Sequence, residues 1–296
     1  MLHVIDLNFQ GIKNSIAAFL VETSDGPVLI ETGPNSTLSH LQAGIEAAGY
    51  DITDISHVLL SHIHLDHAGA AGDFAALGAT IHVHPNGLRH LANPSRLMDS
   101  ARRIYKDQMD RLWGEMKAIP ENQLNAVEDG AVIRVGEEEF IAHHTPGHAV
   151  HHIAWQWGAN LFSGDVAGVR INQGICVPPC PPPDIHVEDW QESIKKIRAI
   201  EPEVLYLTHY GQVTDIDRHL EELENRLLDW ANWMKPYFLK GEALDVITPL
   251  FQAYVKEELI KTGIDADGLV QYESANPSWM SVAGLMRYWK KHTERS

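Results

Sequence analysis

The stretch Ser61–Ala70, SHIHLDHAGA, places three histidines and an aspartate directly after the apolar run ISHVLL, which has the composition of a strand entering a core. In an extended chain alternate residues share a face, so His62 and His64 can point at one metal ion where the strand ends. Asp66 and His67 follow where the backbone turns towards the next helix, and they could hold a second ion. This one segment therefore predicts half of each of two metal sites.

Three later polar residues follow apolar runs in a similar way. His148 comes after a Pro-Gly pair that forces a turn, Asp165 follows the run LFSG, and His209 follows the run LYLT. Loops at strand ends present side chains of this kind to a common site. We therefore expect His148, Asp165 and His209 to complete the two metal sites.

The chain has 18 histidines, and histidine is the commonest metal ligand. A single histidine is nevertheless more often a hydrogen-bonded loop or core residue than a ligand. We prefer that interpretation for His57, His82, His84, His143, His144, His151 and His152. Because His144 and His152 lie beside the loop of His148, we expect these two to donate hydrogen bonds to the ligands.

The charge balance restricts the partners. With 40 acidic and 23 basic residues, the formal charge of −17 disfavours a surface that binds nucleic acid or an anionic membrane. No window offers the roughly 18 apolar residues that a membrane span needs, and the first residues do not resemble a signal peptide. We expect a cytoplasmic protein with a small-molecule substrate, and no role for Cys176 and Cys180 in a disulfide framework or a thiolate zinc site.

The order of predicted elements indicates an α/β layered domain. The segments SIAAFLVET and GPVLIETG read as strands, residues 39–49 as a helix, and AGAAGDFAALG and ATIHVHP as a short helix and a strand. Strands return at AVIRVGEEEFIAHHT, HHIAWQW and NLFSGDV, and a helix over Val187–Ile200 precedes the strand EVLYLTHYG. The predicted domain covers 1–212 and contains a helical insertion at about 86–119.

The apolar residues of the insertion and of the last part of the chain recur at helical spacing. The insertion has an apolar stripe formed by Met98, Ala101, Ile104, Tyr105, Met109 and Leu112. Three helices are predicted within 213–296, with breaks at Gly241 and over Gly263–Gly268. This part is therefore expected to be an α-helical C-terminal extension, in which Trp230, Trp233 and Tyr237 pack in a core.

The ordered set H-x-H-x-D-H at 62–67, followed by His148, Asp165 and His209, resembles the metal-binding signature of the metallo-β-lactamase-fold hydrolases, over about residues 1–212. The resemblance implies an αββα sandwich with the site at one edge of its two sheets. It also implies that His62, His64 and His148 bind one ion, that Asp66, His67 and His209 bind the other, and that Asp165 bridges the two.

Such a site would hydrolyse its substrate without a serine or cysteine nucleophile. Two divalent ions about 3.5–4 Å apart can share a water, lower its pKa from 15.7 towards about 7, and hold the oxygen that becomes negative on attack. The nucleophile would be the metal-bridging hydroxide, and we expect Asp66 and Asp165 to be catalytic. We expect two divalent ions, with zinc preferred and iron and manganese also compatible with imidazole and carboxylate ligands.

Departures from subfamily patterns narrow the hydrolase class. The zinc β-lactamases lack the bridging aspartate, which is Asp165 here, and tRNA-processing phosphodiesterases carry a basic surface, which a charge of −17 disfavours. Acyl-homoserine lactonases commonly have a tyrosine where this chain has Gly168, and glyoxalase II-type thioesterases also add a helical domain. We predict a hydrolase of a small ester, thioester or lactone, resembling the glyoxalase II and lactonase-like branch. A mononuclear iron enzyme resembling persulfide dioxygenases and a phosphodiesterase remain alternatives.

The surroundings of the site should decide the substrate. Arg170, Ile175 and Cys176 follow Asp165 in the chain and are expected to form the wall of the site, while the insertion and the helical extension cover its opening. The basic end RYWKKHTER is expected to be a solvated helix end rather than an anion-binding site. Glu31 stands where the family usually has an aspartate that supports the ligand loops, and its extra methylene should alter their geometry.

Overall fold

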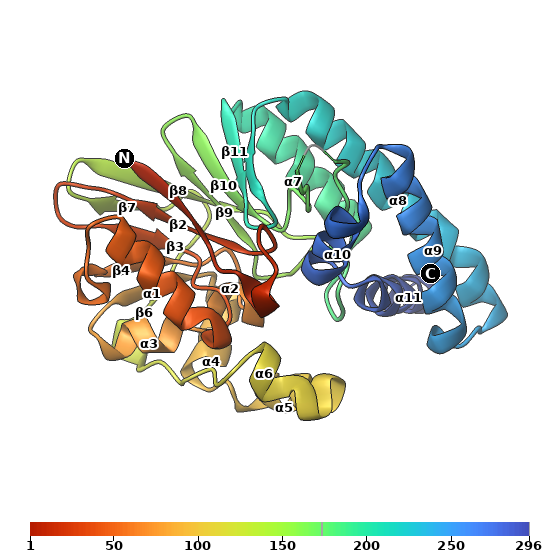
Figure 1. The fold of residues 1–296 in the computed structure, drawn as a ribbon, viewed down its shortest axis with the longest axis horizontal. Helices are drawn as coiled ribbons and strands as arrows, with labels where there is room; N and C mark the ends of the chain where they lie inside the picture. The colour runs from red at the N-terminus through yellow and green to blue at the C-terminus, as the bar shows by residue number, and fades with distance from the viewer. Residues whose placement is uncertain (173, 296) are drawn as a thin grey trace.

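The computed structural model describes residues 1–172 and 174–295 and contains two six-stranded sheets that face each other (Figure 1). The first sheet has the order β1 (Leu2–Asp6), β2 (Ala17–Val21), β3 (Val28–Ile30), β4 (His57–Leu59), β5 (Thr80–Val83) and β6 (Leu124–Ala126). The second has the order β12 (Gly211–Val213), β11 (Val204–Leu207), β10 (Asn160–Gly164), β9 (Ile153–Trp157), β8 (Glu138–His144) and β7 (Val132–Val135). Both sheets are mixed: β3 to β6 are parallel, as are β10 and β11, and the other pairs are antiparallel.

Three apolar clusters hold the layers together. The cluster between the sheets includes Phe19, Phe140 and Trp155, whose side chains are fully buried. A second cluster lies between the first sheet and α1 (Leu38–Ala47), α2 (Leu65–Ala68) and α3 (Ala71–Ala76), and a third lies between the second sheet and α7 (Val187–Ile200). Helices thus cover the outer face of each sheet, and the predicted αββα sandwich is confirmed.

The predicted insertion contains three helices, α4 (Pro85–Ala92), α5 (Ser95–Tyr105) and α6 (Met109–Leu112). Its apolar stripe packs inward in part: Met98, Ala101 and Met109 are buried, whereas the side chain of Ile104 is 44% exposed. The helical pattern ends before 119, because residues 115–120 form no helix, and the next helical turn is the 3-10 turn at Glu121–Gln123.

In its described part, up to residue 295, the helical extension has four helices on the right of Figure 1: α8 (Ile216–Lys240), α9 (Leu244–Lys261), α10 (Ala266–Ala275) and α11 (Ser278–Arg295). The prediction of three helices was wrong, because α10 lies partly in the glycine-containing region that predicts a break. The side chain of Asp265 caps α10 by accepting a hydrogen bond from the backbone N–H of Gly268, and this local contact allows a glycine in the first turn.

The helical extension shares a core with the second sheet. Trp230 is buried in the same cluster as Leu205 and Ile194, and Trp233 and Tyr237 pack against that cluster, as expected for core residues. Among the described residues, no helix combines the length and the apolar character that crossing a membrane requires.

Candidate metal centre

The seven predicted ligands lie in loops and a short helix that meet at one edge of the two sheets. His62 and His64 follow β4, and Asp66 and His67 belong to α2. His148 lies between β8 and β9, Asp165 directly follows β10, and His209 lies between β11 and β12. Because β4 ends at Leu59, the two leading histidines lie beyond the strand, although the backbone at His64 is still extended (φ −63°, ψ 154°). The structure brings all seven side chains together.

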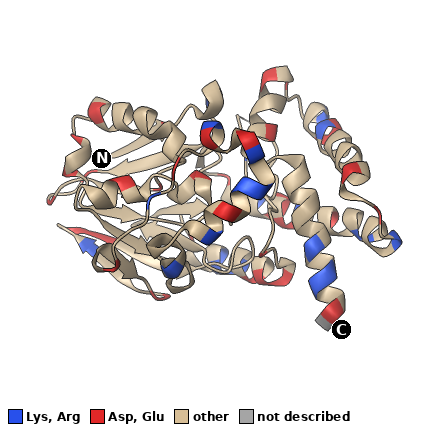
Figure 2. Cartoon of the chain, turned by 90° about the horizontal axis from the view of Figure 1, so that it is seen from below, with Lys and Arg blue, Asp and Glu red and all other residues tan. Residues whose placement is uncertain are grey.

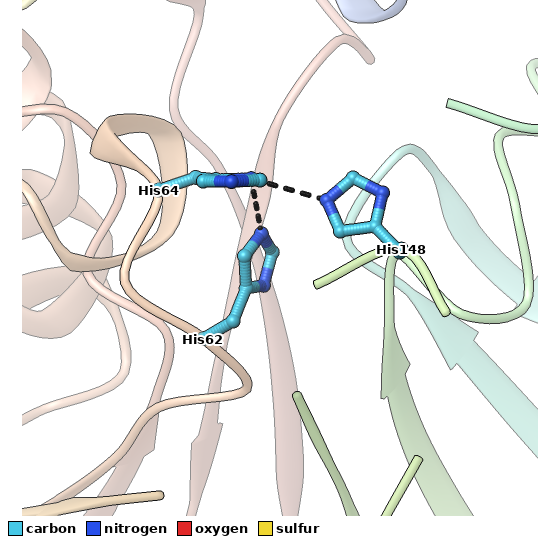
Figure 3. A group of neighbouring side chains, drawn as sticks. All are labelled: His62, His64 and His148. Atoms are coloured by element: carbon cyan, nitrogen blue, oxygen red, sulfur yellow. Dashed lines mark hydrogen bonds between the residues drawn. The ribbon is translucent and has the colours of Figure 1, made fainter. Parts of the chain in front are cut away.

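Three imidazoles converge in a first cluster formed by His62, His64 and His148 (Figure 3). The Nδ1 atom of His64 lies 2.8 Å from Nε2 of His62 and 3.1 Å from Nε2 of His148. Nitrogen ligands 2.0–2.1 Å from a tetrahedral zinc lie about 3.3 Å from one another. The three nitrogens are therefore spaced much as they would be around one metal ion.

A second cluster is formed by Asp66, His67 and His209. Oδ2 of Asp66 lies 3.7 Å from Nε2 of His67 and 3.5 Å from Nε2 of His209. The two clusters are adjacent and contain only imidazole and carboxylate donors, so they could hold two divalent metal ions.

Asp165 lies between the clusters. Its Oδ2 is 3.3 Å from Nε2 of His148, whereas its Oδ1 is 3.2 Å from Nε2 of His67 and 3.4 Å from Nε2 of His209. One carboxylate oxygen thus faces each cluster, which is the geometry that a bridging ligand requires. The assignment of individual residues to individual ions stays a prediction.

Backbone carbonyls orient two of the imidazoles. Nδ1 of His148 lies 2.8 Å from the carbonyl oxygen of Pro179, and Nδ1 of His209 lies 2.8 Å from that of Ser15. A carbonyl oxygen can only accept, so each Nδ1 carries the proton and each Nε2 keeps its lone pair for a metal. The sequence analysis missed Ser15 and Pro179, because any residue can supply a backbone carbonyl.

Glu31 lies beneath the second cluster. Its carboxylate is 1% exposed and lies 3.1 Å from Nδ1 of His67, and it also accepts a hydrogen bond from the backbone N–H of Ser61. The predicted support of the ligand loops by Glu31 agrees with these contacts. Glu31 has a positive φ of 64°, which is a strained backbone conformation for a residue other than glycine. This conformation accompanies the contacts of its carboxylate with His67 and Ser61.

Unpaired polar atoms at the centre of the site fit a metal ion. Nε2 of His67, Nε2 of His209 and Oδ1 of Asp165 are buried, and within the described part of the chain none of them makes a hydrogen bond that meets geometric criteria. Buried polar atoms rarely lack partners, and a bound ion is one kind of partner that satisfies them. These donors are the types that zinc, iron and manganese bind.

The pKa values of the ligand side chains differ between the first and the second cluster. Burial and the neighbouring histidines lower the pKa of His62 well below its usual value and that of His64 to about 3, so both are neutral and able to ligate. Burial alone would raise the pKa of Asp66, but His67 and His209 lower it to about 2. Burial alone would also lower the pKa of His67, but the carboxylates of Asp165 and Glu31 raise it. The second cluster therefore favours a positive charge, which a metal ion would supply.

Of the two other histidines beside the ligand loop, only one contacts a ligand. His152 contacts a ligand as an acceptor and not as the predicted donor: its Nε2 accepts a hydrogen bond from the backbone N–H of Asp165, and its Nδ1 lies 2.8 Å from Oγ1 of Thr145. His144 instead donates from Nε2 to the carbonyl oxygen of Val127, so the prediction that it would act on the ligands was wrong. His144 is the last residue of β8, and its ring packs against His84, after β5, and Val127, after β6, rather than entering the site.

A cavity of about 470 Å³ opens onto the clusters. His64, Asp66 and Asp165 form part of its lining. The wall predicted from sequence was wrong: Arg170, Ile175 and Cys176 are absent from the described lining, and Arg170 instead forms an ion pair with Asp215. The part of the loop after Asp165 that lines the cavity comes later in the chain and consists of Pro179 and Pro181–Pro183. The predicted insertion and the helical extension supply the other walls.

The basic end of α11 supports that proline loop. The side chains of Arg287 and Lys291 both donate hydrogen bonds to the carbonyl oxygen of Pro183. The prediction of a solvated helix end was therefore wrong for these two side chains, because both are bonded to the proline loop.

Cys176 and Cys180 are free and fully buried, and burial raises the pKa of both thiols.

Comparisons with known proteins agree with this site. The family model of the metallo-beta-lactamase superfamily matches residues 12–209. A curated relative, the metallo-beta-lactamase fold-containing protein ST1585 of Sulfurisphaera tokodaii, is 27% identical over 57% of this chain, which spans 66% of that protein. The probable metallo-hydrolase YqjP of Bacillus subtilis is 22% identical over 94% of this chain and 92% of its own length.

Solved structures show the same architecture. The structure of the metallo-beta-lactamase family protein TTHA1429 from Thermus thermophilus has a TM-score of 0.64 at 17% identity, covering 99% of this chain and 94% of that one. The match includes the helical extension as well as the sandwich. With the family model covering most of the sandwich and the ligand-type residues gathered at its edge, this chain belongs to the metallo-beta-lactamase superfamily.

Proposed function

We propose that this chain is a dinuclear metallohydrolase that cleaves a small ester, thioester or lactone, with zinc as its metal. The observation that carries the proposal is the pair of adjacent His/Asp clusters with one oxygen of Asp165 facing each, at the base of a cavity. The similarity to YqjP, which is named a probable metallo-hydrolase, supports the reaction class.

The chain itself prepares the site for this chemistry. Two bound divalent ions would acidify a shared water and polarise the carbonyl oxygen of the substrate. The carbonyls of Ser15 and Pro179 keep the Nε2 atoms of His209 and His148 free of protons, and Glu31 orients His67. These contacts fix the ligand directions in advance, so little reorganisation is needed when the ions and substrate bind.

Charge supports a small substrate over a nucleic acid. The formal charge is −17, and the basic residues are dispersed among acidic ones, with several of them gathered on the C-terminal helix α11 (Figure 2). A phosphodiesterase acting on RNA would gain much of its affinity from neutralising phosphates, which this surface disfavours. We also propose that the protein acts in the cytoplasm and needs neither a nucleic acid nor a membrane as partner.

Metal analysis combined with a substrate panel tests the proposal. Purified protein should contain about two metal ions per chain, mainly zinc, and should hydrolyse at least one class among lactones, thioesters and aryl esters. His62→Ala and Asp165→Ala should reduce the rate to that of the uncatalysed reaction and lower the metal content, because each removes a predicted ligand. His143→Ala is the matched control, since His143 lies on β8 and bonds to Gln156 outside both clusters.

Two outcomes would contradict the proposal. Full hydrolytic activity after the metal has been removed by a chelator would exclude the mechanism. One iron per chain, with oxygen uptake in the presence of glutathione persulfide and no hydrolysis, would replace the hydrolase by the persulfide dioxygenase-like alternative.

A further inference from the structure

The cavity beside the metal clusters is built by segments far apart in the sequence. The chain before β2 contributes Phe9 and Ile16, and the predicted insertion contributes residues from Leu97 to Trp113. The turn between α10 and α11 and the start of α11 contribute residues including Trp279. Since His64, Asp66 and Asp165 line the same cavity, any group held in it lies directly beside the reacting atoms.

Aromatic side chains form one continuous wall of this cavity. The rings of Phe9 and Trp113 stack with centroids 5.4 Å apart, and Tyr105 packs edge-on against Trp113 at 5.2 Å and against Trp279 at 5.9 Å. The hydroxyl of Tyr105 also lies 3.4 Å from Sδ of Met280. This aromatic wall joins the insertion to the helical extension, and all five residues line the cavity.

Few charges face the cavity away from the metal clusters. Arg111 is the only lysine or arginine among the described lining residues, and its guanidinium already donates to the side chains of Gln10 and Gln108. Glu273 is likewise bonded to the backbone N–H and the hydroxyl of Ser278. A ligand with several carboxylates would therefore find no group of free cations here, whereas an apolar ligand would be desolvated against rings and prolines.

We propose that the substrate carries a large apolar, preferably aromatic, group on its scissile carbonyl, and that Trp113, Tyr105 and Trp279 determine this specificity. The inference rests on the proposed hydrolase function. In the reaction, the oxygen of water bonds to the carbonyl carbon and the bond from that carbon to sulfur or oxygen breaks. The products are a carboxylic acid with a bulky apolar group and a thiol or alcohol that takes a proton.

Thioesters that differ in only one part at a time test the proposal. The metal-loaded protein is assayed with the acetyl and 2-naphthylacetyl thioesters of N-acetylcysteamine, and with the same two acyl groups on glutathione. We expect kcat/KM to be at least about tenfold higher for naphthylacetyl than for acetyl, because one methylene in an apolar pocket already changes it about tenfold or more. Glutathione should give no advantage over N-acetylcysteamine.

Two variants probe the aromatic wall by opposite changes. Trp279→Ala removes part of the wall, and Ser100→Trp fills the cavity from an exposed position on α5 without removing any packed side chain. Each should lower the naphthylacetyl-to-acetyl ratio of kcat/KM by at least about fivefold. The controls are Trp233→Ala, whose ring packs in the helical extension away from the cavity, and Ser95→Trp, at an exposed position on the same helix α5; both should keep the wild-type ratio.

Binding of 2-acetylnaphthalene, a neutral ketone without a scissile bond, separates this inference from the hydrolase proposal. Titration calorimetry should show binding to wild type and a Kd at least about fivefold weaker for Trp279→Ala and Ser100→Trp. If no thioester is hydrolysed but this binding pattern holds, the hydrolase proposal fails and the cavity assignment stands. Equal ratios and equal Kd values in wild type and both variants, or a preference for glutathione thioesters, would overturn the cavity assignment.

Discussion

At the scale of single residues, the histidines divide into those that meet at the metal clusters and those that hold the scaffold. His82 is an example of the second kind: Nδ2 of Asn125 donates to its Nδ1, so its Nε2 carries the proton and donates to Nδ1 of His57. Its side chain is 3% exposed, and burial, reinforced by His57, lowers its pKa to about 3. His82 is therefore a neutral structural residue, as expected from sequence.

This neutrality predicts an acid-sensitive contribution to stability. In the unfolded chain the pKa of a histidine is about 6.5, so below that pH the unfolded state binds a proton that folded His82 excludes. Its contribution is complete above pH 6.5 and is lost as the pH falls towards 3; at pH 5 the loss is about 2 kcal/mol. His82→Gln should lose about 2 kcal/mol less unfolding free energy than wild type between pH 7 and pH 5, measured by urea unfolding.

The comparison needs a histidine outside the core. His40 is exposed on α1, so His40→Gln should show the wild-type dependence of unfolding free energy on pH. Contributions of the metal-ligand histidines are common to all three proteins and cancel in the differences. If His82→Gln and wild type lost equal free energy between pH 7 and pH 5, buried neutral His82 would not be a source of acid sensitivity.

At the scale of elements, the site depends on how closely loops approach neighbouring helices. Gly147 precedes His148 and has a φ of 134°, a conformation that favours glycine. A methyl group at this position would overlap the backbone and Cβ of Trp190 on α7. The loop of His148 therefore packs tightly against α7. The helical pattern of the sequence predicted the bounds of α7, Val187–Ile200, correctly.

Gly147→Ala should therefore damage both stability and the first cluster. Backbone strain and overpacking against α7 together should lower the free energy of unfolding by about 3 kcal/mol. Displacement of His148 should also reduce metal content, measured by elemental analysis of the purified variant. Gly158→Ala is the control: its φ is 56°, but its methyl group would meet no atom within 4 Å, so it should cost only about 1 kcal/mol and leave the metal content unchanged.

Retention of full stability and metal by Gly147→Ala would contradict the close approach of this loop to α7. It would show that the loop can move without disturbing His148.

At the scale of the whole molecule, the helical extension is packed as part of the sandwich. Leu220, Leu223 and Trp230 of α8 lie in the same buried cluster as Ile194 of α7 and Leu205 of β11. The start of α11 approaches the proline loop so closely that a methyl group at Gly284 would overlap the carbonyl oxygen of Cys180. Removing the extension would therefore expose apolar residues of α7 and of the proline loop.

A chain that ends at Val213 should not fold stably. Loss of α8–α11 uncovers the apolar residues of α7 and of the loop after Asp165, and fully burying each large apolar side chain contributes about 1.5–3 kcal/mol. We expect no cooperative urea unfolding transition by circular dichroism, whereas a chain that ends at His292 should unfold like the full chain, because Thr293 and Glu294 are exposed. A cooperative transition at the wild-type midpoint in the shorter chain would show that the extension is dispensable for folding.

Much of the fold and site could be predicted because the signals are local. Amphipathic spacing predicted α7, and the composition of strand ends predicted that His62, His64 and the residues around them would gather with His148, Asp165 and His209. Helix α10 was missed because its cap, the contact from Asp265 to Gly268, is a single side-chain interaction within a segment that otherwise reads as a loop.

The amino-acid sequence by itself determined the ligand-type residues, their position at strand ends and the family to which the chain belongs. Only the tertiary structure decided which oxygen of Asp165 faces which cluster, which carbonyls orient His148 and His209, and which residues wall the cavity. The physical reason is distance along the chain. Residue type and strand-end position are properties of a few neighbouring residues, whereas Phe9, Tyr105 and Trp279 become neighbours only when the layers pack.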